Sequence, residues 1–220
     1  MVDGDVEIRA GVALLAGHLT VPERACGLVV FAHGSANGRR RPRSRFVSTI
    51  LNRAGMATLL VDLLTRDEEL DPEHVFDIGL LAGRLSDATW WVRSQSVIDR
   101  LPIAYFGSST GAAAALWAAA EPGSDIAAVV SRGGRADLAG ARLGLVRAPT
   151  LLVVGGNDDV VLTLTLAAQA RLNCEHRVAV VPGATHLFDE PGTLRRVADL
   201  TREWYVRHWP APAAVQHTAA

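Results

Sequence analysis

The chain has 220 residues, of which 49% are hydrophobic and 20% are charged, so it can bury one core and is not a disordered segment. Its formal net charge of −1 gives no overall field that would attract nucleic acid or an anionic membrane. No uninterrupted apolar run reaches the roughly 18 residues of a membrane span. The acidic residues 1–5 do not resemble a signal peptide, and we expect a cytoplasmic protein.

Short apolar runs alternate with helical stretches, which is typical of a mostly parallel sheet with helices on both faces. A hairpin of residues 6–9 and 12–20 is expected first. Further strands are expected at residues 28–32, 57–62, 101–106, 127–130, 150–154 and 177–181. Helices are expected at residues 43–54, within 76–98, at 109–120, around 162–172 and at 193–209. The pattern predicts a single α/β domain over residues 1–209, followed by a flexible tail at 210–220.

The sequence Gly107-Ser108-Ser109-Thr110-Gly111 lies between an apolar strand and an Ala-rich helix. This G-x-S-x-G pattern is typical of a sharp strand-to-helix turn that holds a nucleophilic serine above the edge of a sheet. Both glycine positions need small residues, because backbone segments nearly touch there. A tight turn with chance glycines is the alternative, but the flanking strand and helix favour Ser109 as a nucleophile.

A serine nucleophile needs a base and an acid, and both are expected further along the chain. Asp158 follows the strand at residues 150–154, where its carboxylate could orient a histidine. Spacing does not separate it from Asp159, and either aspartate could instead cap the next helix. We expect Asp159 to cap the helix and Asp158 to face the site. His186 is the predicted base, because it follows both partners on a loop after the last strand.

Four segments, taken together and in chain order, carry a family resemblance: His33-Gly34-Ser35, residues 107–111, Gly155-x-x-Asp158-x-x-Val161 and Pro182-Gly183-Ala184-Thr185-His186. They are similar to the α/β-hydrolase superfamily, and within it to the dienelactone-hydrolase-like group of small single-domain enzymes. The resemblance implies an α/β-hydrolase fold and acyl-transfer chemistry on an ester, lactone or thioester. Dienelactone hydrolase proper has a cysteine nucleophile where this chain has Ser109, so the dienelactone substrate does not carry over.

The same resemblance implies an oxyanion hole. The backbone N–H groups of Ser35 and Thr110 would bind the negative charge that forms on the substrate oxygen. His33 would brace this loop and would not act as a base. No metal or organic cofactor is implied.

Two further regions bear on the pocket. Residues 131–149 leave room for one short helix and for no large cap domain, so we expect an open site for small acyl groups. Arg132 follows a strand end and is a candidate substrate-binding residue for an anionic substrate. The arginine-rich residues 39–45 are interpreted first as a solvated start of a helix, paired with the acidic, loop-like residues 66–77. The alternative is that they, like Arg132, bind an anionic substrate.

The sequence therefore predicts a serine hydrolase, carboxylesterase-like or lactonase-like, that cleaves a small ester, lactone or thioester through an acyl-enzyme. An acyltransferase that uses the same site is one alternative, and a catalytically silent binding protein of the same fold is another. The expected partner is a small-molecule substrate, with neither nucleic acid nor membrane, and a homodimer is left open.

Overall fold

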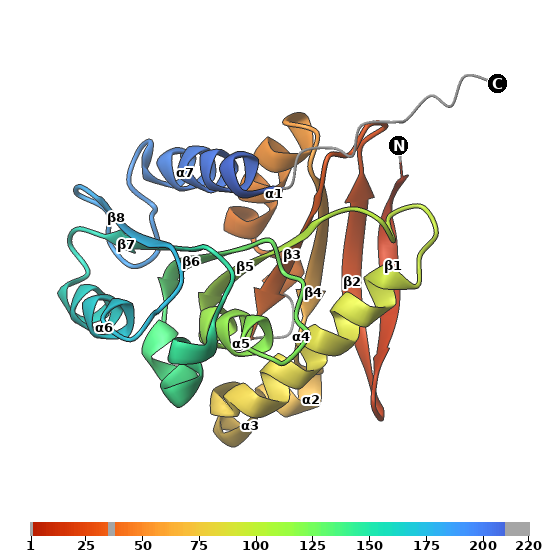
Figure 1. Cartoon of the computed structure of the whole chain (residues 1–220), viewed down its shortest axis with the longest axis horizontal. Coiled ribbons are helices and arrows are strands. Elements are labelled where there is room, and N and C mark those ends of the chain that lie inside the picture. Colours follow the sequence, from red (N-terminus) through yellow and green to blue (C-terminus); the bar gives the residue numbers. More distant parts are fainter. Residues whose placement is uncertain (1, 35–37, 210–220) are drawn as a thin grey trace.

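The computed structural model of the chain describes residues 2–34 and 38–209, so the tail predicted at residues 210–220 lies outside the described part. The described residues form an eight-stranded sheet in the order β1-β2-β4-β3-β5-β6-β7-β8 (Figure 1). The strands are β1 (Val2–Ala10), β2 (Ala13–Val21), β3 (Leu28–His33), β4 (Ala57–Asp62), β5 (Ile103–Ser109), β6 (Ala128–Gly134), β7 (Thr150–Gly155) and β8 (His176–Val181). All eight predicted strands are present, but β1 begins four residues earlier than expected and β6 ends four residues later, so Arg132 lies within β6 and not after it.

Helices cover both faces of this sheet. They are α1 (Pro42–Arg53), α2 (Arg66–Glu69), α3 (Pro72–Phe76), α4 (Ile78–Arg93), α5 (Thr110–Ala119), α6 (Asp159–Gln169) and α7 (Thr193–His208), with two 3₁₀ segments, η1 (Gly38–Arg40) and η2 (Ala136–Leu145). Helices α1 and α7 pack side by side on one face, and α4, α5, α6 and η2 lie on the other (Figure 1). Within the described ranges, no helix is both long enough and apolar enough to cross a bilayer.

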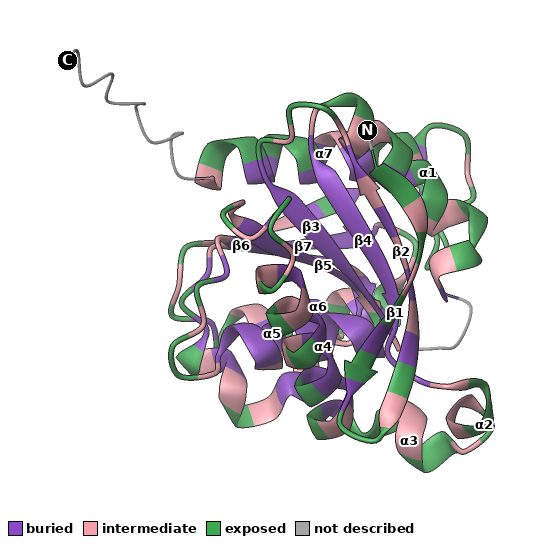
Figure 2. Ribbon diagram, turned by 90° about the vertical axis from the view of Figure 1, so that its right-hand side faces the viewer, coloured by how far each residue is buried: buried purple, intermediate pink, exposed green. Residues whose placement is uncertain are grey.

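The central strands are apolar on both faces because each face has its own core. In β3, Leu28 and Val30 join the cluster beneath α4 and α5, whereas Val29 and Phe31 join the cluster beneath α1 and α7. Successive side chains of a strand point to opposite faces, so a strand buried on both sides shows no polar alternation. Figure 2 shows the resulting buried central strands between partly exposed helices.

The direction of the strands determines where a site can form. The β1–β2 pair and the β2–β4 pair are antiparallel, whereas every pairing from β4 to β8 is parallel. The carboxyl ends of β3, β5, β6, β7 and β8 therefore meet at one edge of the sheet, which is where ligands gather in open α/β folds.

The prediction of a loop at residues 66–77 is wrong, because this stretch forms the short helices α2 and α3. Thr65 and Glu68 make a reciprocal capping box at the start of α2, and Asp71 caps α3 through the backbone N–H of Glu73. The Glu68 carboxylate also accepts a hydrogen bond of 2.7 Å from Arg84 on α4. The expectation of no large cap domain is confirmed, since η2 alone fills most of the space between β6 and β7 in the described chain.

Candidate active site

Ser109 occupies a strained turn between β5 and α5. Its backbone has φ 53° and ψ −131°, a conformation that only glycine adopts without strain. The turn is tight on both sides. A Cβ atom added at Gly107 would lie 2.5 Å from the Cα of Ala112, and one at Gly111 would lie 2.2 Å from the carbonyl oxygen of Ala32. The sequence pattern thus forms the predicted sharp turn, with Ser109 exposed at its tip.

The strain at Ser109 leads to a prediction about stability. We expect Ser109→Gly to be more stable than Ser109→Ala by about 1 kcal/mol, because glycine relieves a backbone strain of roughly 1–3 kcal/mol and loses part of that gain to chain entropy. At Ser108, whose φ is not positive, the order should reverse, and Ser108→Gly should be the less stable variant. Urea unfolding of the four variants measures both differences. The same order at the two positions would contradict a strained turn.

Asp158 and His186 are joined directly. The Nδ1 atom of His186 lies 2.7 Å from Oδ2 of Asp158. A carboxylate only accepts hydrogen bonds, so Nδ1 carries the proton, and in the neutral imidazole Nε2 is then the acceptor. The side chain of Asp158 is 12% exposed and that of His186 is 47% exposed, so the acid is shielded while the imidazole can reach substrate and solvent.

Asp158 faces His186 as expected, but the expectation that Asp159 caps α6 is wrong. Oδ1 of Asp158 accepts a hydrogen bond of 3.3 Å from the backbone N–H of Val161, so Asp158 caps α6 as well as holding His186. Asp159 is the first residue of α6 and is exposed. One carboxylate performs both tasks because its two oxygens face different partners.

The loops that carry these two residues are packed together. The backbone N–H of Asn157 donates to the carbonyl of Ala184 at 2.9 Å, and the side chain of Asn157 donates to the carbonyl of Gly183 at 3.1 Å. Glu190, which the sequence interpretation missed, accepts hydrogen bonds from both the backbone N–H and the hydroxyl of Thr185. These contacts fix the residue that precedes His186 and so help to position the imidazole.

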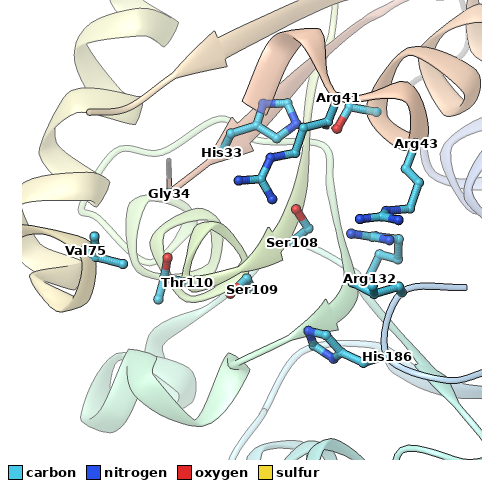
Figure 3. Close-up of a pocket in the computed structure, with 12 residues that line it drawn as sticks. His33, Gly34, Arg41, Arg43, Val75, Ser108, Ser109, Thr110, Arg132 and His186 are labelled. Atoms are coloured by element: carbon cyan, nitrogen blue, oxygen red, sulfur yellow. Dashed lines mark hydrogen bonds between the residues drawn. The ribbon is translucent and has the colours of Figure 1, made fainter. Parts of the chain in front are cut away.

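Ser109 and His186 line the same pocket of about 220 Å³ at the carboxyl edge of the sheet (Figure 3). Within the described residues, no hydrogen bond joins the Ser109 hydroxyl to the imidazole. Hydrogen bonds of this kind are often long in the absence of substrate and shorten when it binds. The pocket also contains Val75 of α3 and Leu187, neither of which the sequence pattern singled out.

Of the two predicted oxyanion donors, one can be placed. Thr110 is the first residue of α5, where a backbone N–H has no partner inside the helix and carries part of the positive end of the helix dipole. Its buried side chain lies against Gly34, where an added Cβ would come within 2.1 Å of the Thr110 hydroxyl. Ser35 lies outside the described residues, so its amide stays a prediction.

His33, which directly precedes Gly34 in the chain, is buried. Its Nε2 atom lies 2.8 Å from the hydroxyl of Ser44 on α1, which fits a bracing role. Burial lowers the pKa of His33 from the ordinary 6.5 to about 4. The folded protein therefore keeps this imidazole neutral at a pH where the unfolded chain would protonate it.

This shift predicts a pH dependence of folding. The contribution of neutral His33 is fully present above pH 6.5, and it is lost as the pH falls toward 4. Between pH 7 and pH 5 we expect the wild type to lose about 2 kcal/mol more unfolding free energy than His33→Gln. Urea unfolding at the two pH values measures this. Parallel losses in the two proteins would contradict the assignment.

Contrary to the sequence interpretation, no ion pair joins the arginine-rich residues to the acidic stretch in the described part of the chain. Arg39 forms an ion pair with Asp62 at the end of β4, and Arg43 pairs with Asp189 at 2.8 Å. Arg41 and Arg43 line the pocket beside Ser109. The stretch starts α1 at the edge of the sheet where the site lies, so its side chains reach the pocket.

Arg132 also lines this pocket, where the sequence placed a candidate substrate-binding residue. It stands next to Ser108 in the β5–β6 register. Its guanidinium lies over the ring of Phe188, 5.6 Å from the ring centroid.

Similarity to known proteins shows the family to which this chain belongs. No family model matches the chain. The crystal structure of dienelactone hydrolase from Anabaena variabilis is 47% identical in sequence and superposes with a TM-score of 0.90, covering 95% of this chain and 99% of that one. The chain belongs to the dienelactone-hydrolase-like group of the α/β-hydrolase superfamily. The α/β-hydrolase fold predicted from the sequence is thereby confirmed.

Two other proteins are similar to this α/β-hydrolase, one in fold and one in sequence. An α/β serine hydrolase without lid from Xanthomonas campestris shares the fold, with a TM-score of 0.76 at 18% identity, over 96% of each chain. A Mycobacterium tuberculosis protein named "Putative phosphoribosyl transferase" is 56% identical over 210 residues. That match covers 96% of this chain but 47% of the relative, so the chain spans about half the length of that protein.

Proposed function

We propose that this α/β-hydrolase is a serine hydrolase that cleaves a small carboxylic ester, lactone or thioester. In this proposal Ser109 is the nucleophile, His186 the general base and Asp158 the acid that orients it. The observation that carries it is the strained turn at Ser109, which exposes the serine to the same pocket as an imidazole already bound to a carboxylate. A hydroxyl needs such a base to become a nucleophile at neutral pH.

The proposed reaction proceeds in two steps. Nε2 of His186 takes the proton from Ser109 while Oγ attacks the carbonyl carbon, and the carbonyl electrons move onto the oxygen. That proton then passes to the leaving alcohol or thiol as its bond to the carbonyl carbon breaks, which leaves an acyl-enzyme. Water attacks the acyl carbon with His186 again as base, and the acid leaves as Ser109 regains its proton.

The positive end of α5 supports stabilisation of the intermediate. The N–H of Thr110 would donate to the oxyanion, and the predicted second donor is the N–H of Ser35. Loss of one such donor typically costs roughly 3–4 kcal/mol of transition-state stabilisation. Asp158 would stabilise the imidazolium of His186 while the charge persists.

The pocket itself supports a small substrate. Its volume of about 220 Å³ lies below the usual range for drug-sized ligands, which is roughly 300–1,000 Å³. Its mouth is bordered by exposed residues, including Ser109 and Leu187. A short acyl group would fit, whereas a long lipid chain would stay in solvent.

Transfer of the acyl group to an alcohol or amine is the closest alternative, since it uses the same acyl-enzyme. The 47% exposure of the His186 side chain favours water as the acceptor, because solvent reaches the base directly. We do not assign this site the transferase activity in the name of the M. tuberculosis relative, since the chain matches only 47% of that protein.

The proposed function is tested by turnover of p-nitrophenyl esters, lactones and thioesters of graded acyl length. We expect the highest kcat/KM for short acyl groups, with a steady fall once the chain outgrows the pocket. Adding alcohols or amines should leave the free acid as the main product. Turnover of all substrates at the buffer rate would contradict the proposal, and a preference for long acyl chains would contradict the substrate size.

A further inference from the structure

The pocket beside Ser109 carries a strong excess of positive charge. Three arginines line it: Arg41 at the N-cap of α1, Arg43 in the first turn of that helix, and Arg132 near the end of β6. Among the described residues that line it, there is no aspartate or glutamate. Figure 3 shows the three side chains reaching the pocket from two sides, with the guanidinium groups of Arg43 and Arg132 next to each other.

The surroundings of the Arg132 guanidinium are hard to explain unless a ligand binds to it. Its Nη1 atom is buried and has no hydrogen-bond partner within the described part of the chain. The contact with the ring of Phe188 uses the face of the guanidinium and satisfies none of its N–H groups. A buried donor left unpaired costs roughly 1–3 kcal/mol, and more if it is charged. An acceptor that arrives with the substrate would remove this cost.

Other arginines of this protein have carboxylate partners. Arg84 pairs with Glu68, Arg93 with Asp125 and Arg135 with Asp137. Arg135 lies three residues from Arg132 in the sequence, yet it makes two hydrogen bonds to its aspartate. Arg41 and Arg132 have no carboxylate partner among the described residues, and both line the pocket, where a bound anion could serve them.

We propose that Arg41, Arg43 and Arg132 form a subsite for a phosphate monoester group of the substrate. This inference rests on the proposed function, because the phosphate would belong to the same molecule as the ester that Ser109 attacks. Asp189 pairs with Arg43 at 2.8 Å, so the three arginines and this one carboxylate together carry a net charge of +2. A phosphate monoester carries a charge of about −1.5 to −2 at pH 7, close to that excess.

The shape of the group also favours phosphate over carboxylate. Phosphate offers three terminal oxygens in a tetrahedral arrangement, whereas a carboxylate offers two oxygens in one plane. Three guanidinium groups that approach from α1 and β6 can each donate to a separate phosphate oxygen. Burial, with Arg43 nearby, lowers the pKa of Arg132 to about 10, so the guanidinium still carries its charge at neutral pH.

The subsite is tested by calorimetric binding of three aromatic probes to the wild-type protein: phenyl phosphate, benzoate and benzyl alcohol. We expect phenyl phosphate to bind at least about tenfold more tightly than benzoate, and benzyl alcohol to bind most weakly. Arg132→Ala should weaken phenyl phosphate binding about tenfold or more. Arg135→Ala is the matched control, since it removes an equal charge near the same strand end, and it should leave this affinity unchanged.

A second pair of variants keeps the test decisive if Arg132→Ala does not fold. Arg132→Lys keeps the positive charge but lacks the planar set of N–H donors of a guanidinium. Arg41→Ala removes an exposed side chain. Each should weaken phenyl phosphate binding by about threefold or more. Equal losses in the Arg132 and Arg135 variants would overturn the subsite. Equal affinity for benzoate and phenyl phosphate would overturn the assignment to phosphate.

The binding experiment does not depend on a reactive serine, so the two proposals can fail separately. Phosphate binding that depends on Arg132, together with an inert Ser109, would reject the hydrolase and keep the anion subsite. Ester turnover in a protein that does not discriminate phenyl phosphate from benzyl alcohol would reject the subsite and keep the hydrolase.

Discussion

Replacing Ser109 with alanine is expected to lower kcat for a short-chain ester by roughly 10⁴-fold or more. The variant lacks the oxygen that forms the acyl-enzyme, so only the oxyanion donors and the binding pocket remain. Its fold should persist, because alanine at this exposed position meets the same backbone strain as serine. Steady-state kinetics with p-nitrophenyl acetate, together with urea unfolding, measures both effects.

Ser108 provides the matched control for this experiment. It is the adjacent residue, it is also a serine, and it lines the same pocket. Its backbone has no positive φ, so it does not occupy the strained position at the tip of the turn. Ser108→Ala should retain turnover to within about tenfold. Similar losses in the two variants would contradict the assignment of Ser109 as the nucleophile.

Asp158→Asn should have the second-largest effect, a loss of roughly 10³- to 10⁴-fold in kcat. The asparagine oxygen can still accept from the backbone N–H of Val161, so the cap of α6 survives. Its amide N–H₂, however, would face Nδ1 of His186, and this favours the tautomer that carries the proton on Nε2. In that tautomer the imidazole cannot accept the proton from Ser109. Steady-state kinetics with the same ester measures the loss.

Asp159→Asn separates the two adjacent carboxylates. Asp159 is exposed in the first turn of α6, and its side chain makes no hydrogen bond to His186 among the described residues. We expect this variant to keep wild-type turnover to within about threefold, since exposed substitutions of this kind have small effects. Comparable losses in both variants would contradict the role of Asp158.

Those parts of the molecule that depend on local patterns could be predicted from the sequence. The apolar run at β3 and the strand, turn and helix around Ser109 are each specified by neighbouring residues. The helix α2 could also have been predicted, because Thr65 and Glu68 have the spacing of a capping box. The acidic composition of residues 66–77 led instead to the prediction of a loop.

Other parts depend on contacts between distant segments and could not be predicted. That Asp158 both caps α6 and holds His186 follows from how the loop after β7 packs against the loop after β8, for example through Asn157 and Ala184. The position of Arg41 and Arg43 follows from where α1 starts relative to the edge of the sheet. Neither of these arrangements can be recognised from the spacing of residues in the sequence. The run of arginines was therefore interpreted first as a solvated start of a helix.

The most direct test of the central claim is mass spectrometry of the wild-type protein after reaction with a fluorophosphonate. A serine activated by His186 displaces fluoride from phosphorus, so the adduct should lie on the peptide that contains Ser109. Ser109→Ala should give no adduct under the same conditions. An unmodified wild-type protein, or an adduct that persists in Ser109→Ala, would contradict the assignment of Ser109 as the nucleophile.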